Sequence, residues 1–329
     1  MRALVTGGGG FLGRAIIEQL LLRGDRVRSF ARGCYPELAA RGVEVVQGDV
    51  ADSNAILRAV RGSDVVFHVA AKAGIWGRAA DFFSANVKGT DNVIRACRQE
   101  GIGRLVYTSS PSVVFDGHDM EGVDESVPYA RTYRADYPRT KALAEKRVLA
   151  ANSSELASVA LRPHLLWGPH DTQLTKSILA RGRAGTLTRI GSRDPLVDFT
   201  YIENAALAHV LAADRLSLGA EISGRPFFIS QGEPVPLWSF VDRLLAAGSL
   251  PPVRRVISPR LAYLAATLFE LAYRLLRLTG EPRLTRFLAE ELCTAHWFDI
   301  GAARRELGYA PIVSIEEGLR RLRASLEAS

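Results

Sequence analysis

The sequence TGGGGFLG, residues 6–13, stands between an apolar run, Met1–Val5, and a helical pattern over Arg14–Arg23. It predicts a short buried strand, a tight glycine turn and a helix. Backbone N–H groups at a helix N-terminus can bind an anion, and glycine lets the backbone approach it closely. The glycines whose spacing matters are Gly7, Gly10 and Gly13. Because they follow a strand and open a helix, we expect them to hold the phosphates of a dinucleotide.

Composition narrows the class of protein. The chain has 329 residues, 47% hydrophobic and 23% charged, as in ordinary globular proteins that are not embedded in a membrane. Three scattered cysteines and six histidines show no metal-ligand spacing, so we expect reduced thiols and no metal site. The net charge of +7 is dispersed, which argues against nucleic acid as a partner. Since the chain begins directly with a strand, we expect no secretory leader and a cytoplasmic location.

Strands and helices alternate through the first half of the chain. This alternation predicts an α/β fold, a doubly wound parallel sheet of the Rossmann type, with a smaller and mostly helical C-terminal substrate lobe. We expect a nucleotide domain at 1–164, with 197–230 packing back onto it, and a substrate-binding lobe made of 165–196 and 231–329. The predicted strands after the first are 26–30, 43–47, 64–69, 105–109 and 159–162, followed by 197–202 and 227–230. The predicted helices include 53–60, 83–100, 137–150, 174–184, 204–214, 236–247, 259–278 and 315–326.

The end of the second strand bears on the choice of cofactor. Folds of this type that prefer NAD place an acidic residue there, for the ribose 2′-hydroxyl. This chain has Ala31 followed by Arg32, and a guanidinium suits a 2′-phosphate, so we predict NADP(H). Asp49, after the third strand, can accept a hydrogen bond from the adenine amine or cap the helix at 53–60. The small residues after the fourth strand, Ala70 and Ala71, would let the chain pass close to the nicotinamide.

A tyrosine and a lysine four residues apart begin the helix at 137–150. Tyr137 and Lys141 share one helix face, and an ammonium beside a phenol favours the phenolate and lowers the pKa of the tyrosine. Such a tyrosine can exchange a proton with an oxygen while a hydride moves. The hydroxyls of Ser109 and Ser110 stand at the carboxyl edge of the sheet, where ligands bind in open α/β folds. The polar loop 114–135 between them and Tyr137 is predicted to be a lid or binding loop.

The helix at 259–278 is the most hydrophobic in the chain. Its leucines and aromatic residues form a broad apolar face, and its charged residues form a polar stripe. The charges argue against a helix that spans a membrane. Three interpretations stay open: a core or interface helix, the wall of a site for a long acyl chain, or a surface helix that touches a membrane.

Together these features resemble the extended short-chain dehydrogenase/reductase family. Within it, the chain resembles the 3β-hydroxysteroid dehydrogenase branch and, through the motifs AAKAGIWG (70–77) and YTSSPSV (107–113), the 2-alkyl-3-oxoalkanoate reductases of bacterial long-chain olefin biosynthesis. The resemblance implies that Tyr137 is the acid/base, that Lys141 lowers its pKa and holds the nicotinamide ribose, and that Ser110, or alternatively Ser109, binds the substrate oxygen. The cofactor-binding residues that it implies are Gly7, Gly10, Phe11, Leu12, Gly13, Arg32, Asp49, Val50, Ala70, Ala71, Lys72, Tyr137, Lys141 and Pro163.

The implied reaction is NADPH-dependent reduction of a 2-alkyl-3-oxoalkanoate, a long-chain β-keto acid, to the 2-alkyl-3-hydroxyalkanoate. The resemblance also implies a homo-oligomer and assembly with the downstream olefin enzymes, a thioesterase-like hydrolase and a β-lactone-forming ligase. The nearest alternative is a 3β-hydroxysteroid or C4-carboxysterol dehydrogenase. A sugar-nucleotide epimerase would retain NAD, which conflicts with Ala31 and Arg32. A non-catalytic NADP-sensing regulator is an alternative of another class, and the intact Tyr137 and Lys141 argue against it.

Overall fold

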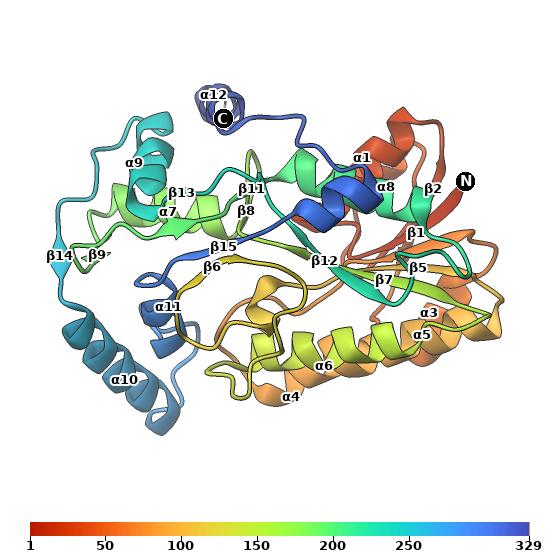
Figure 1. Cartoon of the computed structure of the whole chain (residues 1–329), viewed down its shortest axis with the longest axis horizontal. Coiled ribbons are helices and arrows are strands. Elements are labelled where there is room, and N and C mark those ends of the chain that lie inside the picture. Colours follow the sequence, from red (N-terminus) through yellow and green to blue (C-terminus); the bar gives the residue numbers. More distant parts are fainter. Residues whose placement is uncertain (329) are drawn as a thin grey trace.

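A seven-stranded parallel sheet forms the centre of the computed structural model, which describes residues 1–328 (Figure 1). Its strand order is β12-β7-β5-β4-β1-β2-β3, and every neighbouring pair is parallel. The order reverses between β1 and β4, which places the ligand crevice of an open α/β sheet beside the glycine turn. The bounds are β1 Arg2–Thr6, β2 Arg26–Ala31, β3 Glu44–Gln47, β4 Val65–His68, β5 Arg104–Thr108, β7 Ala157–Pro163 and β12 Arg225–Ile229.

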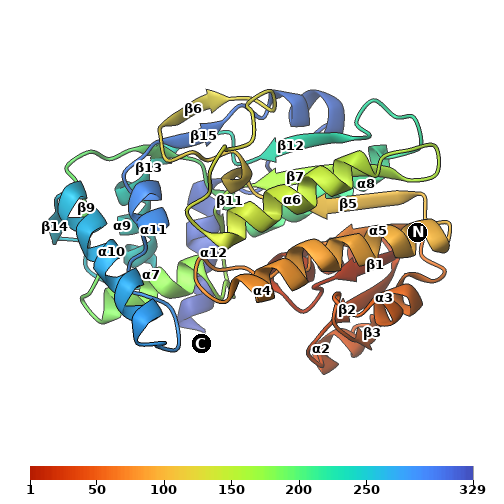
Figure 2. The ribbon, with the colours of Figure 1, turned by 90° about the horizontal axis from the view of Figure 1, so that it is seen from below.

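Helices cover both faces of this sheet (Figures 1 and 2). Alternate residues of β1 enter different cores: Ala3 and Val5 belong to the larger hydrophobic cluster, while Leu4 belongs to the second. This division follows from the two-residue period of a strand and confirms the predicted doubly wound fold. The larger cluster includes α1 (Phe11–Leu22) and α8 (Ile202–Arg215), and the second includes α3 (Ser53–Val60), α5 (Gly89–Gln99) and α6 (Asp136–Ala150).

The predicted helix at 83–100 begins earlier than expected and is not regular. Its first turn is α4 (Ala79–Phe82), a π-helical segment covers Phe83–Lys88, and α5 continues to Gln99. A short helix, α2 (Pro36–Ala39), and the 3₁₀ turn Pro111–Val113 complete this half. Asp49 does not cap α3, because the carboxylate of Asp52 accepts from the backbone N–H groups of Asn54 and Ala55.

The predicted lid loop at 114–135 contains a strand. Residues Met120–Val123 form β6, which pairs in parallel with β15 (His296–Phe298), a strand that lies more than 170 residues further along the chain. The second sheet runs β13-β10-β15-β6, with β10 at Leu196–Val197 and β13 at Val235–Pro236. The loop prediction was therefore wrong over this stretch, because the partner strand is remote in sequence and leaves no local signal.

Most of the remaining elements lie towards the other end of the molecule (Figure 2), whereas the π turn at Ala303–Leu307 contacts α8 and β12. The strand expected at 197–202 is divided between β10 and β11 (Thr200–Tyr201), and β11 pairs with β8 (Leu166–Trp167). The helices are α7 (Leu174–Arg183), α9 (Leu237–Ala247), α10 (Pro259–Leu275), α11 (Arg286–Glu291) and α12 (Ile315–Glu327), with β9 (Arg189–Ile190), β14 (Val256–Ile257) and a π turn at Ala303–Leu307. The division into a nucleotide domain and a substrate lobe stays a prediction.

The helix α10 buries a different face from the one expected of a core helix. Its buried residues are Ala262, Ala266 and Glu270, four apart on one side. Its leucines point outward, and Leu268 is 57% exposed. Glu270, which the sequence placed in a polar stripe, is instead buried and ion-paired with Arg286 at 2.8 Å. None of the helices within residues 1–328 has the length and apolar character needed to cross a membrane.

Candidate active site

The glycine turn is closed so tightly that two of its positions admit no side chain. Gly7 has a φ of +71°, and a Cβ there would lie 2.9 Å from the backbone of Ala70. A Cβ on Gly13 would lie 2.2 Å from the carbonyl oxygen of Gly7, inside any permitted contact. Gly10 is the N-cap of α1, and no side chain caps the helix there. The free N–H groups at this end of α1 therefore face the crevice, where an anion can bind.

A buried hydrogen-bond chain fixes the strand ends beside the turn. The Thr6 hydroxyl lies 2.8 Å from Nδ1 of His68, and His68 Nε2 lies 3.0 Å from the Thr90 hydroxyl. Thr90 donates to the Asn86 carbonyl, so His68 must donate from Nε2 and accept at Nδ1. Burial lowers the pKa of His68 to about 3, which agrees with a neutral ring. These hydrogen bonds hold the ends of β1 and β4 side by side under the cofactor crevice.

The edge of the crevice beyond β2 carries an arginine, Arg32. Within residues 1–328, the exposed Arg32 makes no ion pair, and its carbonyl accepts from the Gln47 side chain at 2.7 Å. The Tyr35 ring covers Gly9 and lies 5.3 Å from the Arg14 guanidinium, an aromatic wall that the sequence reasoning missed. The Asp49 carboxylate accepts from the Ala51 N–H at 2.9 Å and closes a turn at the crevice edge.

Three side chains of the predicted catalytic set lie where the carboxyl end of β5 meets the first turns of α6. The Ser110 side chain lies beside Tyr137 and lowers its pKa, and the Ser110 hydroxyl lies 2.9 Å from the Ser112 hydroxyl. Lys141 is 2% exposed, donates from Nζ to the Thr108 carbonyl and lies 4.2 Å from the Tyr107 ring centroid. The Ser109 hydroxyl is buried without a partner among the described residues. This geometry favours Ser110 over Ser109 as the partner of Tyr137.

The electrostatics differ from the prediction that Lys141 lowers the pKa of Tyr137. Burial raises the pKa of Tyr137, against a lowering from the Ser110 hydrogen bond, and the Glu291 carboxyl raises it further. Burial also lowers the pKa of Lys141 to about 7, so its ammonium loses a proton more readily than that of an exposed lysine. The protein by itself therefore keeps the phenol protonated, which suits an acid that must release its proton to a substrate.

Two buried anchors hold α6 in place. The carboxylate of Glu145, one turn beyond Lys141, forms a fully buried ion pair with Arg162 of β7 at 2.6 Å. Asn86 accepts from the backbone N–H of Lys72 at 2.7 Å and donates to the Thr140 hydroxyl at 2.9 Å. The first anchor ties the catalytic helix to the sheet, and the second ties it to the loop after β4. Asn86 therefore links the π-helical segment to α6 and to the loop after β4.

The crevice continues past Tyr137 into the C-terminal half of the chain. Glu291, at the end of α11, lines the same cavity as Tyr137, and burial raises the pKa of its carboxyl to about 8. His164 also lines it, and its Nε2 lies 2.7 Å from Nδ1 of His296. The sequence offered no signal for Glu291, because a glutamate on a short, unrecognised helix looks like a surface residue.

One cavity of about 830 Å³ contains the whole predicted site. Every predicted cofactor and catalytic residue lines it: Gly7, Gly10, Phe11, Leu12, Gly13, Arg32, Asp49, Val50, Ala70, Ala71, Lys72, Ser109, Ser110, Tyr137, Lys141 and Pro163. A second cavity, of about 720 Å³, adjoins it and shares Ile75 and Phe287 as a common wall. The second cavity runs beneath α10, along Tyr273 and Arg274.

Known proteins resemble this chain over almost all of its length. The family model described as the 3-beta hydroxysteroid dehydrogenase/isomerase family matches residues 4–256. A 2-alkyl-3-oxoalkanoate reductase of Stenotrophomonas maltophilia is 54% identical over 330 residues, covering 100% of both chains. Another, of Shewanella oneidensis, is 49% identical and covers 98% of this chain and 86% of its own.

More distant similarity extends to sterol enzymes and to solved structures. The mouse sterol-4-alpha-carboxylate 3-dehydrogenase, decarboxylating, is 34% identical over 97% of this chain and 89% of its own. The crystal structure of the Thermus thermophilus UDP-glucose 4-epimerase, a complex with NAD, has a TM-score of 0.77 and 24% identity, and covers 100% of both chains. At that identity the likeness shows the fold alone.

Proposed function

Because this chain belongs to the 3-beta hydroxysteroid dehydrogenase/isomerase family, we propose that it reduces a 2-alkyl-3-oxoalkanoate to the 2-alkyl-3-hydroxyalkanoate with NADPH. The coarser activity, that of an NAD(P)-dependent oxidoreductase, follows from the family and from the named relatives. The observation that carries the finer proposal is the meeting of Ser110, Tyr137 and Lys141 in one cavity with the glycine turn. The same arrangement argues against a non-catalytic sensor, which has no need of a proton donor.

The residues present fit a dinucleotide phosphate. The turn at Gly7 and Gly13 leaves no room for a Cβ, so the backbone itself forms the cradle. Arg32 supplies an unpaired guanidinium at the rim, where a 2′-phosphate of NADP would accept two hydrogen bonds. Lys141 would hold the nicotinamide ribose. When bound, the reduced nicotinamide supplies the hydride.

The protein's own residues would supply a proton and hold the substrate carbonyl in place. The substrate's 3-carbonyl oxygen would accept hydrogen bonds from the hydroxyls of Ser110 and Tyr137. When that carbonyl is reduced, the C=O π electrons would end on the oxygen, and Tyr137 would transfer its phenolic proton to it. The product would carry a C–H and an O–H where the substrate had C=O, and Tyr137 would be left as a phenolate. Bulk water then returns the proton to Tyr137.

Two features of the cavities support a branched β-keto acid. Glu291, with a pKa raised to about 8, is protonated at neutral pH and can donate a hydrogen bond to a carboxylate that an ionised side chain would repel. The substrate has two alkyl arms, and the two adjoining cavities, with their shared wall of Ile75 and Phe287, offer two directions for them. The olefin pathway and assembly with its other enzymes remain part of the proposal, on the resemblance alone.

One assay tests the reaction and the substrate together. NADPH oxidation is followed with a panel of 2-alkyl-3-oxoalkanoates and, in parallel, 3-ketosteroids and C4-carboxysterols. We expect turnover with the branched keto acids and little with the ring substrates. The reverse preference would favour the sterol dehydrogenase, which the 34% identical relatives represent. Binding of NADP without turnover of any carbonyl compound would indicate a sensor instead.

A separate comparison tests the cofactor. We expect kcat/KM for NADPH to exceed that for NADH by at least about two orders of magnitude, because each of the two charge-assisted hydrogen bonds from Arg32 is worth about 1.5–3 kcal/mol. Replacing Arg32 by Gln should reduce that preference and leave the NADH reaction nearly unchanged. An enzyme that prefers NADH would contradict the assignment of NADP.

A further inference from the structure

A tyrosine ring closes the outer side of the glycine turn. Tyr35 follows β2, and its ring lies so close to Gly9 that a Cβ there would come within 2.0 Å of the tyrosine Cζ. The spacing that indicates a phosphate cradle uses Gly7, Gly10 and Gly13, and it gives no reason for a further glycine at position 9. The contact supplies that reason, because a side chain at position 9 would push the ring away from the turn.

Neighbouring residues hold the ring in this place. Tyr35 is the N-cap of α2, and its carbonyl accepts from the N–H of the buried Leu38 at 3.0 Å. The Arg14 guanidinium lies 5.3 Å from the centroid of the ring, and its Nε donates to the Gly9 carbonyl at 2.9 Å. Glu37 of α2 forms an ion pair with the same guanidinium. The ring therefore belongs to a packed cluster that joins the glycine turn, α1 and α2.

The hydroxyl of Tyr35, in contrast to its ring, has no partner. A Cβ on Gly33 would lie 2.8 Å from the tyrosine Oη, so the hydroxyl lies beside the residue that follows Arg32. Within residues 1–328 this hydroxyl makes no hydrogen bond, and Arg32 makes no ion pair. Arg32, Gly33 and Tyr35 all line the cavity that contains the glycine turn. One short segment thus brings a free hydroxyl and a free guanidinium to the edge of the crevice beyond β2.

An anion with several acceptor oxygens fits these two donors. A phosphate monoester carries a charge of about −1.5 to −2 at neutral pH and offers three acceptor oxygens, so one phosphate can accept from Arg32 and from Tyr35 together. A ribose 2′-hydroxyl is neutral and gives no charge-assisted hydrogen bond. We propose that Tyr35 helps to determine the preference for NADP(H), by donating a hydrogen bond from its hydroxyl to the adenosine 2′-phosphate. This inference rests on the proposed use of NADPH.

The packing of the ring explains why this hydrogen bond would discriminate well. Because the ring is held between Gly9 and the Arg14 guanidinium, its hydroxyl is in place before the ligand arrives. A donor that is already ordered loses little conformational entropy on binding, so more of the hydrogen-bond energy appears as affinity. The cluster also links the 2′-phosphate site to the phosphate cradle, since Gly9 belongs to the glycine turn and Arg14 to the first turn of α1.

Calorimetric titration of the full chain with two fragments of the cofactor tests the proposal without turnover. 2′,5′-ADP carries the 2′-phosphate and 5′-AMP lacks it, so the ratio of their dissociation constants isolates the recognition of that phosphate. We expect the wild-type protein to bind 2′,5′-ADP at least about 100-fold more tightly. Tyr35→Phe removes the hydroxyl, keeps the ring on Gly9 and should reduce this ratio by about tenfold. Gly9→Ala, whose Cβ displaces the ring, should also reduce it.

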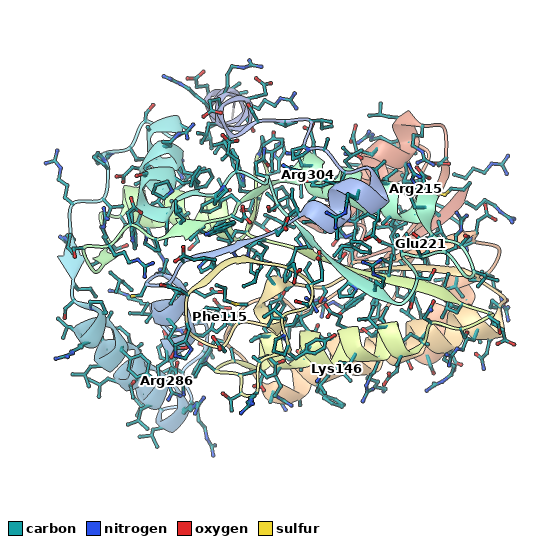
Figure 3. The ribbon with its side chains drawn as sticks, in the orientation of Figure 1. Phe115, Lys146, Arg215, Glu221, Arg286 and Arg304 are labelled. Atoms are coloured by element: carbon teal, nitrogen blue, oxygen red, sulfur yellow. The ribbon has the colours of Figure 1, made fainter. Side chains whose placement is uncertain are left out.

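Tyr263→Phe is the matched control and should leave the ratio unchanged. Tyr263 lies on α10 and lines neither cavity, and its neighbour Arg286 is on the other side of the molecule from α1 (Figures 1 and 3). If Tyr35→Phe weakened both fragments by the same factor, the tyrosine would have no part in phosphate recognition, and the proposal would be overturned. Wild-type discrimination that survives Tyr35→Phe would overturn the role of Tyr35 alone. A wild-type ratio near one would overturn the proposed NADPH preference as well.

Discussion

Helices α1 and α10 carry similar sequence patterns and use them in opposite ways. Leu12, Ile16, Ile17 and Leu20 of α1 are buried against the sheet. In α10 the leucines face outward, and Ala262, Ala266 and Glu270 are buried. Helical periodicity thus identified a face on each helix, but it could not say which side the protein would cover. That choice depended on the space available beneath each helix.

The space differs for a physical reason. Beneath α1 lies a sheet of strands whose apolar residues point towards it, and burying a leucine there stabilises the fold by about 2 kcal/mol. Beneath α10 lies the short helix α11, close enough that only alanine fits at the contact, and Arg286 offers a partner for Glu270. The outward leucines contribute nothing of this kind to folding.

Tyr137→Phe should have the largest effect, at the site that α1 helps to form. Removing the proton donor is expected to lower kcat by about 10²- to 10⁴-fold, while the affinity for NADPH changes little. Steady-state kinetics and a fluorescence titration of the cofactor measure the two quantities separately. Turnover that is retained in this variant would rule out the proposed role of Tyr137.

Gly13→Ala tests how tightly the start of α1 is packed. The added methyl group would lie 2.2 Å from the Gly7 carbonyl oxygen, so the turn must open. We expect a loss of about 3 kcal/mol in the free energy of unfolding, together with weaker cofactor binding. Gly103→Ala is the control, since a Cβ there would meet nothing within 4 Å. Equal stability of the two variants in urea unfolding would show that the turn yields easily.

Two substitutions two residues apart, about half a helical turn on α10, compare its inner and outer sides. Ala266→Leu should destabilise the protein by about 1–3 kcal/mol, because the site beneath it is full. Leu268→Ala should change the free energy of unfolding by no more than about 0.5 kcal/mol, because Leu268 is 57% exposed. Urea unfolding of both variants gives the comparison. A reversed order would mean that α10 packs through its leucines.

Glu291 joins the two regions, because α11 packs on α10 and also lines the crevice. Its carboxyl titrates near 4.5 when the chain is unfolded and near pH 8 in the folded protein, so the folded state binds the extra proton between these values. Stability contributed by the protonated form is complete below about pH 4.5 and is lost as pH rises through 8. Glu291→Gln should therefore flatten the fall in unfolding free energy over this window. Denaturant unfolding across the pH range measures it, and identical slopes in both proteins would contradict the assignment.

Local patterns sufficed for most of the nucleotide-binding half. The glycine turn, the parallel strands and the Tyr137–Lys141 pair all depend on residues near one another in sequence, and the turn and the pair line one cavity. Strand β6 escaped prediction because its partner β15 is remote. Glu291 escaped because its burial depends on the packing of α11. The raised pKa of Tyr137 depends on burial too, and no spacing between two residues could show it.

The sequence by itself determined the doubly wound sheet and the glycine turn, because these follow from the alternation of strands and helices and from the absence of a Cβ at Gly7 and Gly13. Its motifs also carried the resemblance to the family that the comparisons show. Only the tertiary structure decided which side of α10 is buried, which serine meets Tyr137 and which carboxyl enters the crevice. These features arise from contacts between segments far apart in the chain. Burial and charge at such contacts are properties of the assembled fold.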